Sequence, residues 1–358
     1  MSLQAIRDVR ADCQTALAGQ DSELAPLMGD TILVTGGTGF VGTWLAETLA
    51  CLNDDFGFKL KVALLSRSVD RFKVVYPHLG NRPDFRLIRA DVRNIYDLPS
   101  ETNWLVHAAS TPDSRFHSTN PVETMTVIAD GTVAVIRGLD RCSNFKKFLQ
   151  ISSGLVNGAQ PLNLERMPEV FAGSSAFGTV SSAYVEAKRF AETYCAAARS
   201  QQRLPIVTAR PFAFIGPYQS LETPWAINNF IRDALLGNDI RVLGDGQTVR
   251  SYMYGSDMAV WLLKILTSGT PGASYNVGNP EGITLERVAR LISERFIPNP
   301  GVRLHTSESN ANQRSILVPD VTLAMKTLRV SITTPLEPAI DKTIRWNRAC
   351  SGLPKTAE

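Results

Sequence analysis

Residues 31–42 read TILVTGGTGFVG and set a short apolar run directly before three glycines, Gly36, Gly39 and Gly42, in the spacing GxxGxxG. Glycines between a strand and a helix let the chain turn tightly, let backbone N–H groups approach a pyrophosphate and let the helix pack close to the strand. A turn without a ligand could use the same glycines. The apolar run before them and the helical pattern after them favour a dinucleotide site.

Short apolar runs recur through the first part of the chain, and segments with helical patterns separate them. Further runs cover residues 60–65, 85–91, 104–109 and 147–153. Helices are expected at about 41–52 and 121–140. Strands that alternate with helices in this way build a parallel sheet with helices on both faces. We therefore predict an α/β fold with a doubly wound parallel sheet.

We expect the chain to divide into three parts. After residue 210 the regular alternation of strands and helices gives way to irregular segments rich in Pro and Gly. Residues 1–29 form an N-terminal helical extension, in which the apolar spacing over 3–18 predicts an amphipathic helix. Residues 30–210 form an NAD(P)-binding Rossmann domain. Residues 211–358 form a smaller α/β lobe that mainly binds the substrate and returns some chain to the sheet. The extension serves packing or, alternatively, a dimer contact.

The composition is that of an ordinary globular protein, with 44% hydrophobic and 20% charged residues among 358. A net charge of +3 is too small to indicate nucleic acid or an anionic membrane surface as a partner. We see no signal peptide and no apolar run of the roughly 18 residues that a membrane span needs. The five cysteines lie far apart, so we expect no metal site and a reduced, cytoplasmic setting.

The end of the second predicted strand discriminates between NAD and NADP. An acidic residue there would accept a hydrogen bond from the ribose 2′-OH and repel a 2′-phosphate. This chain has Ser66 followed by Arg67 instead, which favours NADP, although NAD stays possible. An ordinary surface arginine is the alternative interpretation of Arg67.

Other cofactor contacts are expected where the predicted strands end. Asp91 and Val92 follow the third strand and are placed to contact the adenine, and Ala108 and Ala109 are small enough for the backbone to lie along the cofactor. The full expected set is Gly36, Thr38, Gly39, Phe40, Val41, Gly42, Ser66, Arg67, Asp91, Val92, Ala108, Ala109, Ser110, Ile151, Tyr184, Lys188, Pro211 and Phe212.

Tyr184 and Lys188 stand four residues apart, on one face of a predicted helix. A nearby ammonium and the positive nicotinamide would lower the pKa of the tyrosine, so that its phenolate acts as a base near neutral pH. Ser153 ends a predicted strand before this helix and is expected to orient the substrate oxygen, with Ser152 as the rival candidate. The pair alone could also be a half-buried tyrosine beside a solvated lysine. The strand-end serine before it favours a catalytic triad of Ser153, Tyr184 and Lys188.

These three elements, in this order, resemble the extended short-chain dehydrogenase/reductase superfamily, in its nucleotide-sugar epimerase, dehydratase and reductase branch. The family pattern TGGxGFxG is met by residues 35–42, S(S/T)xxVYG is approached by residues 152–158, and YxxxK is met by Tyr184 and Lys188. The resemblance covers about residues 30–345. It implies an NAD(P)-dependent enzyme that acts on a nucleotide-linked sugar, and a homodimer.

The C-terminal half carries two further resemblances. Residues 210–217 are similar to the family's RxFNxYGP, and residues 244–257 are similar to GDGxxxRDFxxVxD. In this branch the arginine of the second pattern pairs with the substrate's diphosphate. The resemblance therefore implies that Arg250 binds the diphosphate and that Arg314 assists it, through charge-assisted hydrogen bonds.

The chain also departs from the family pattern. Dehydratases of this branch carry Asp-Glu after the catalytic hydroxyl, where this chain has Gly154 and Leu155, so 4,6-dehydration is not expected. The resemblance still places Ser153 and Gly154 beside the substrate. Three more positions replace the usual Tyr, Asn and Asp, namely Asn157, Ala213 and Ser251.

The leading hypothesis is therefore reduction of a 4-keto nucleotide sugar, or C4 epimerisation through such a ketone, with Tyr184 as the acid and base. One alternative is a reductase of an apolar ketone or alcohol, similar to the flavonoid- and steroid-acting relatives, which the segment around Arg250 disfavours. Another is a non-catalytic NADP-sensing protein. The intact pair of Tyr184 and Lys188 disfavours the second alternative.

Overall fold

The computed structural model describes residues 2–111, 113–176, 178–305 and 315–350. Within them, seven strands form one sheet in which every neighbouring pair is parallel. The order across this sheet is β11 (Ser274–Val277), β6 (Ile206–Pro211), β5 (Lys147–Ile151), β4 (Trp104–His107), β1 (Thr31–Thr35), β2 (Lys61–Ser66) and β3 (Phe85–Arg89). The predicted α/β fold with a parallel sheet is confirmed.

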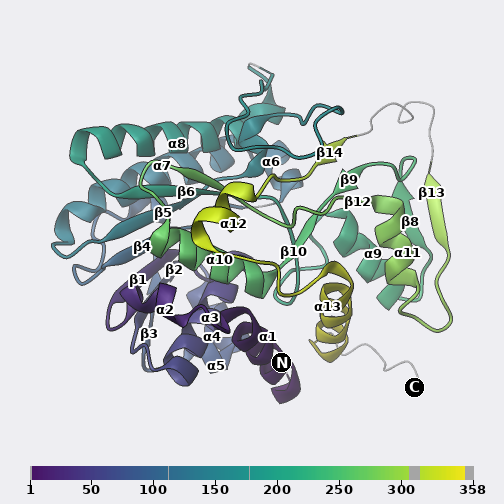
Figure 1. Ribbon diagram of the computed structural model, residues 1–358, viewed down its shortest axis with the longest axis horizontal. Coiled ribbons are helices and arrows are strands. Elements are labelled where there is room, and N and C mark those ends of the chain that lie inside the picture. Colours follow the sequence, from purple (N-terminus) through teal and green to yellow (C-terminus); the bar gives the residue numbers. More distant parts are fainter. Residues whose placement is uncertain (1, 112, 177, 306–314, 351–358) are drawn as a thin grey trace.

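Helices cover both faces of the sheet (Figure 1). The first half of the chain contributes α1 (Leu3–Leu17), α2 (Asp21–Leu24), α3 (Phe40–Phe56), α4 (Val69–Val75), α5 (Pro77–Gly80), α6 (Ser114–Thr119) and α7 (Pro121–Gly138). The second half contributes α8 (Ala183–Gln202), α9 (Ala226–Leu235), α10 (Gly255–Ser268), α11 (Leu285–Ser293), α12 (Thr322–Leu328) and α13 (Leu336–Cys350). No helix in the described ranges is long and apolar enough to cross a bilayer.

The central strand β1 explains why both faces are covered. All five of its residues are buried, and successive side chains of a strand point to opposite faces. Ile32 and Val34 belong to the core that includes α3 and α10, whereas Leu33 belongs to a second core that includes α7 and α8. A strand that is apolar on both faces must lie between two layers of helices.

The C-terminal part of the chain forms a smaller group of short strands and helices, drawn to the right in Figure 1. Its strands are β7 (Ala213–Ile215) paired with β10 (Tyr252–Tyr254), β8 (Ile240–Leu243) paired with β13 (Val302–His305), and β9 (Val249–Arg250) between β12 (Ile283–Thr284) and β14 (Ile316–Leu317). β11 returns to the main sheet beside β6. The boundary at residue 210 stays a prediction.

The N-terminal extension packs on the main domain through buried polar contacts. α1 lies against α3 and α10, and its buried Asp12 accepts a hydrogen bond of 2.7 Å from the hydroxyl of Tyr254. Lys264 of α10 is only 1% exposed and pairs with Glu23 of α2. Its ammonium also donates to the carbonyl of Arg329 at 3.1 Å. A lysine that is buried to this extent depends on its anionic partner.

We expect Glu23→Gln to lower the free energy of unfolding by about 2 kcal/mol, because it leaves the ammonium of Lys264 buried without a counter-charge. Lys264→Met removes that buried charge and fills the same space, so it should cost less. Urea unfolding of both variants measures the difference. A larger loss for Lys264→Met than for Glu23→Gln would contradict this account of the contact.

Candidate active site

Two glycines where β1 meets α3, Gly36 and Gly42, lie too close to the backbone for any side chain. Gly36 has φ of +69°, and a Cβ there would lie 2.8 Å from the carbonyl oxygen of Ala108. A Cβ at Gly42 would lie 2.5 Å from the backbone of Gly37. Both contacts are shorter than carbon atoms tolerate, so the sequence pattern reports a real steric requirement. Ala108, which was expected along the cofactor, lies beside this turn.

The first turn of α3 has the features of an anion site. Its N-cap is Gly39, which has no side chain to accept hydrogen bonds from the first N–H groups of the helix. Such N–H groups, together with the helix dipole, favour a negatively charged ligand. Phe40 and Val41, both expected at the cofactor, begin this helix. The turn and the helix end together fit the pyrophosphate of a dinucleotide.

Polar contacts join the glycine turn to the end of β2. The hydroxyl of Thr38 donates to the hydroxyl oxygen of Ser66 at 2.6 Å, and the N–H of Ser68 donates to the same oxygen at 3.2 Å. Arg67 follows on the surface and pairs with Glu123 of α7 at 3.4 Å. The structure therefore places Ser66 and Arg67 at the edge of the candidate nucleotide site.

Asp91, which was expected to contact the adenine, has a partner within the protein. Arg93 donates to both of its carboxylate oxygens, at 2.9 and 2.7 Å, and lowers the pKa of Asp91. Val92 is buried directly after it. Sequence reasoning missed Arg93, because nothing in its local pattern separates it from a surface arginine. The backbone N–H of Arg93 also donates to Asp91 at 3.0 Å, so Arg93 makes three hydrogen bonds to this carboxylate.

Lys188 lies deep in the protein at the ends of two strands. Its ammonium donates to the carbonyl of Ile151 at 2.8 Å, where β5 ends, and to the hydroxyl of Ser110 at 3.4 Å, beyond the end of β4. It is 2% exposed, and burial lowers its pKa to about 8. The structure therefore brings together Lys188, Ile151 and Ser110, three residues that were all expected at the cofactor.

Tyr184 lies one helical turn before Lys188, which stands 5.8 Å from the centre of its ring. Burial raises the pKa of Tyr184, and a hydrogen bond with Ser153 opposes this rise. Desolvation is thus the larger effect on the pKa of Tyr184 in the protein alone, and the lowering of this pKa by the ammonium together with the positive nicotinamide stays a prediction. The resting tyrosine is a neutral phenol that can donate a proton.

The structure distinguishes the two candidate serines. Ser152 donates to the carboxylate of Glu192, which also accepts two hydrogen bonds from Arg210 at 3.0 and 2.7 Å. The hydroxyl of Ser152 is thus bound to a partly buried ion pair. Ser153 is 8% exposed and is the one of the two serines that forms a hydrogen bond with Tyr184.

His117 of α6 covers the face of Tyr184, and sequence reasoning missed it. The two rings stack with their centres 4.3 Å apart and their planes 10° from parallel. Nε2 of His117 donates to the carbonyl of Thr111 at 2.6 Å, which holds the imidazole in place. A single histidine in a polar segment gives no signal that could have indicated this stack.

Phe212 packs on Gly154 at the expected position of the substrate. A Cβ at residue 154 would lie 2.5 Å from the ring of Phe212. The ring thus occupies the space that a side chain at position 154 would need. Leu155 follows and is partly exposed. Pro211, before Phe212, ends β6 beside Val277 of β11.

Arg250 lies on β9, in the C-terminal part of the chain. It donates to the carbonyls of Val249 at 2.8 Å and Ser315 at 3.2 Å, and to the hydroxyl of Ser315 at 3.0 Å. Burial lowers its pKa, and no carboxylate in the described ranges pairs with it. Arg314 lies outside the described residues. Arg250 is thus a partly desolvated cation whose partners are neutral.

Two of the three residues that replace family positions, Asn157 and Ser251, are buried, and the third, Ala213, is partly buried. Asn157 accepts a hydrogen bond from Arg210 at 3.2 Å and donates to the carbonyl of Pro168 at 3.0 Å, so it supports the chain that follows β5. Ser251 is fully buried, and its hydroxyl has no partner. Nothing in the structure explains the serine at position 251.

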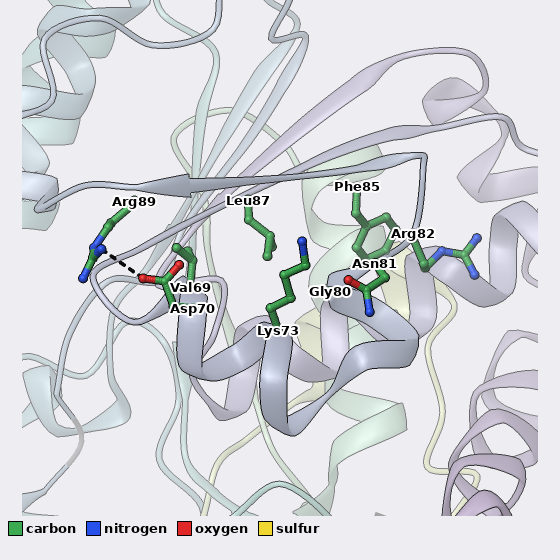
Figure 2. Close-up of a pocket in the computed structure, with 9 residues that line it drawn as sticks. All are labelled: Val69, Asp70, Lys73, Gly80, Asn81, Arg82, Phe85, Leu87 and Arg89. Atoms are coloured by element: carbon green, nitrogen blue, oxygen red, sulfur yellow. Dashed lines mark ion pairs between the residues drawn. The ribbon is translucent and has the colours of Figure 1, made fainter.

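A separate hollow lies where α4 and α5 pack beside the edge strand β3 (Figure 2). Asp70 and Arg89 form an ion pair of 2.9 Å at one end of it. Its lining consists of Val69, Asp70, Lys73, Gly80, Asn81, Arg82, Phe85, Leu87 and Arg89. None of the residues expected in the site lines this hollow.

The sequence and the fold match known proteins. The model of the NAD dependent epimerase/dehydratase family matches residues 32–278. UDP-glucuronic acid decarboxylase 5 of Arabidopsis thaliana is 30% identical over 297 residues, which cover 83% of each chain. UDP-glucuronic acid decarboxylase 4 of the same plant is 28% identical, and the match covers 83% of this chain but only 64% of that protein.

Solved structures share the fold. An epimerase of Methanothermobacter thermautotrophicus superposes with a TM-score of 0.76 at 20% identity, covering 94% of this chain and 97% of that one. The enzyme WbmF of Bordetella bronchiseptica, in complex with NAD+ and UDP, gives 0.75 at 21% identity, with 92% and 95% covered. The chain belongs to the NAD dependent epimerase/dehydratase family, which confirms the family resemblance of the sequence.

The buried Lys188 makes a prediction about stability and pH. Its pKa is about 8 in the folded protein and near its ordinary value of 10.5 in the unfolded chain, so between these values the unfolded chain binds the extra proton. Stability from this group should therefore rise as the pH increases from 8 to 10.5. Lys188→Met should lose this rise, and the exposed Lys326→Met should keep it, in urea unfolding across that range. Identical pH profiles for all three proteins would contradict the burial effect.

Proposed function

We propose that this family member moves a hydride at C4 of the sugar of a nucleoside diphosphate sugar, and so catalyses 4-keto reduction or C4 epimerisation. The observation that carries the proposal is the contact of Tyr184 with Ser153 and Lys188, where Lys188 binds the strand ends at Ile151 and Ser110 at the carboxyl edge of a parallel sheet. Ligands of such sheets bind at this edge.

The residues present fit a nicotinamide dinucleotide. The turn at Gly36 and the first turn of α3 suit the pyrophosphate, and Ser66 and Arg67 suit the ribose. The bound dinucleotide would supply the hydride chemistry that no side chain of this protein offers. Arg67 favours NADP in our proposal. WbmF, which shares the fold, has been solved with NAD+ and with NADH.

Tyr184 would exchange the proton at the substrate oxygen. As a neutral phenol it donates to the carbonyl oxygen that becomes a hydroxyl, and Ser153 holds that oxygen by a hydrogen bond. In the opposite direction the phenol must lose its proton, which a positive charge close to the ring favours. Lys188, with its pKa near 8, carries such a charge for part of the time at neutral and mildly basic pH.

Arg250 would bind the diphosphate of the substrate. It has neutral partners and is partly desolvated, so an anion with several oxygens would gain charge-assisted hydrogen bonds from it. This supports a nucleotide sugar over an apolar ketone. A neighbour with the same fold, the UDP-N-acetylglucosamine 4-epimerase of Methanobrevibacter ruminantium, has been solved with UDP-N-acetylmuramic acid.

A decarboxylase is the second candidate, because the curated relatives at 28–30% identity are UDP-glucuronic acid decarboxylases. Oxidation at C4 would turn a sugar carboxylate on C5 into a β-keto acid, which loses CO2 readily. Dehydration is disfavoured, since Phe212 fills the space at Gly154 where a carboxylate side chain would stand.

Tyr184→Phe should abolish product formation and leave dinucleotide binding within about twofold, because only the hydroxyl that exchanges the proton is lost. The assay incubates wild type and variant with NADPH or NAD+ and with 4-keto-6-deoxy nucleotide sugars, UDP-glucose and UDP-glucuronic acid, and identifies products and CO2 by mass spectrometry. Undiminished turnover would remove Tyr184 from the mechanism. CO2 from UDP-glucuronic acid would favour the decarboxylase.

Arg67→Ala should weaken NADPH binding by about tenfold and NADH binding by less than about twofold, because of the two dinucleotides only NADPH carries a 2′-phosphate with which the guanidinium can pair. Quenching of protein fluorescence measures both dissociation constants without a substrate. Equal losses for the two dinucleotides would overturn the preference for NADP.

A further inference from the structure

Four charged side chains meet at the ribose end of the candidate cofactor site. Arg67 follows β2, Asp91 and Arg93 follow β3, and Glu123 lies in the first turn of α7. We call these four residues the ribose-end cluster. They come from three separate segments of the chain, and the carboxylate of Glu123 joins two of the segments.

Glu123 binds a different arginine with each of its oxygens. Oε2 accepts from Arg93 at 2.7 Å, and Oε1 accepts from Arg67 at 3.4 Å. Arg93 is fixed further by Asp91 and by the hydroxyl of Thr126 at 3.3 Å. Glu123 therefore lies in the bridging position of the cluster.

The cluster is electrically balanced. Two guanidinium groups face two carboxylates, and Arg93 already satisfies Asp91 through two hydrogen bonds. The charge of Arg67 also contributes to the lowered pKa of Asp91, so Arg67 lies within electrostatic reach of that carboxylate. In the described ranges, Glu123 is the one carboxylate that forms an ion pair with Arg67.

The position of the cluster links it to cofactor choice. Ser66 precedes Arg67 and accepts a hydrogen bond from Thr38 in the glycine turn, so the cluster begins where the adenosine ribose of a dinucleotide would lie. A 2′-phosphate carries between one and two negative charges at neutral pH. It would need the guanidinium of Arg67, which Glu123 already binds, and it would be repelled by the carboxylate of Glu123.

We propose that Glu123 is a specificity-determining residue that limits the preference for NADP and lets this site accept both NAD and NADP. Arg67 attracts the 2′-phosphate, and Glu123 opposes it by holding Arg67 and by like-charge repulsion. Removal of the Glu123 charge leaves the cluster with one excess positive charge. This inference rests on the proposed function, because it requires a dinucleotide at the glycine turn.

The test measures dissociation constants of NADPH and NADH by fluorescence, without substrate or turnover. Glu123→Gln should tighten NADPH binding by about tenfold and change NADH binding by less than about twofold. The gain should shrink as the salt concentration rises from about 50 to about 500 mM. The charges of the cluster are partly exposed, so salt screens their interaction with the 2′-phosphate. Glu101→Gln is the matched control: it removes a partly exposed carboxylate that pairs with Arg86 at 3.3 Å, before β4, and should change neither constant.

The double variant Arg67→Ala with Glu123→Gln should lose most of the gain, since Arg67 is the group that Glu123 releases. Weaker or unchanged NADPH binding by Glu123→Gln would overturn the inference, and so would an equal gain for both dinucleotides. If wild type binds neither dinucleotide, the proposed function fails and the inference fails with it. If wild type binds both and Glu123→Gln changes nothing, the inference alone fails.

Discussion

The rest of the structure depends on the close approach of backbone segments at the end of β1. A Cβ at Gly42 would meet Gly37 at 2.5 Å, and one at Gly36 would meet Ala108 at 2.8 Å. The first contact brings α3 against the strand, and the second brings the end of β4 beside the same turn. Because β1 lies between β2 and β4, this turn sets the ends of three strands around one space. The remaining groups of the site are arranged around that space.

Burial of a cation is the second constraint, and it connects the helix α8 to the sheet. Lys188 gives up most of its hydration and in return binds the carbonyl of Ile151 and the hydroxyl of Ser110. These contacts fix the rotation of α8, so that Tyr184 faces the same strand ends. Desolvation favours the uncharged forms of both side chains, which explains why the pKa of Tyr184 is raised while that of Lys188 is lowered.

Much of the fold and part of the site could be predicted from the sequence, because their determinants are local. The glycine spacing and the four-residue spacing of Tyr184 and Lys188 each lie within one element or turn. His117 and Glu123 could not be found in this way, and Phe212 was expected at the cofactor but not in contact with Gly154. Their partners lie on other segments, so only the packing of α6, α7 and β6 around the sheet brings them into contact. Arg67 was foreseen as an isolated cation, whereas its carboxylate partner was not.

The departures from the family pattern fall on the substrate side and leave the hydride side intact. The ring of Phe212 occupies the space that a side chain at position 154 would need. Asn157, which stands where the family pattern has a tyrosine, accepts a hydrogen bond from Arg210. Removal of a sugar hydroxyl needs an acid beside the leaving oxygen, and neither Gly154 nor Leu155 can supply one. In the function that we propose, hydride and proton transfer at one carbon would need only the dinucleotide, Ser153, Tyr184 and Lys188. The arrangement therefore supports chemistry confined to one oxygen-bearing carbon, and any further bond cleavage, such as loss of CO2, would have to follow from the ketone itself.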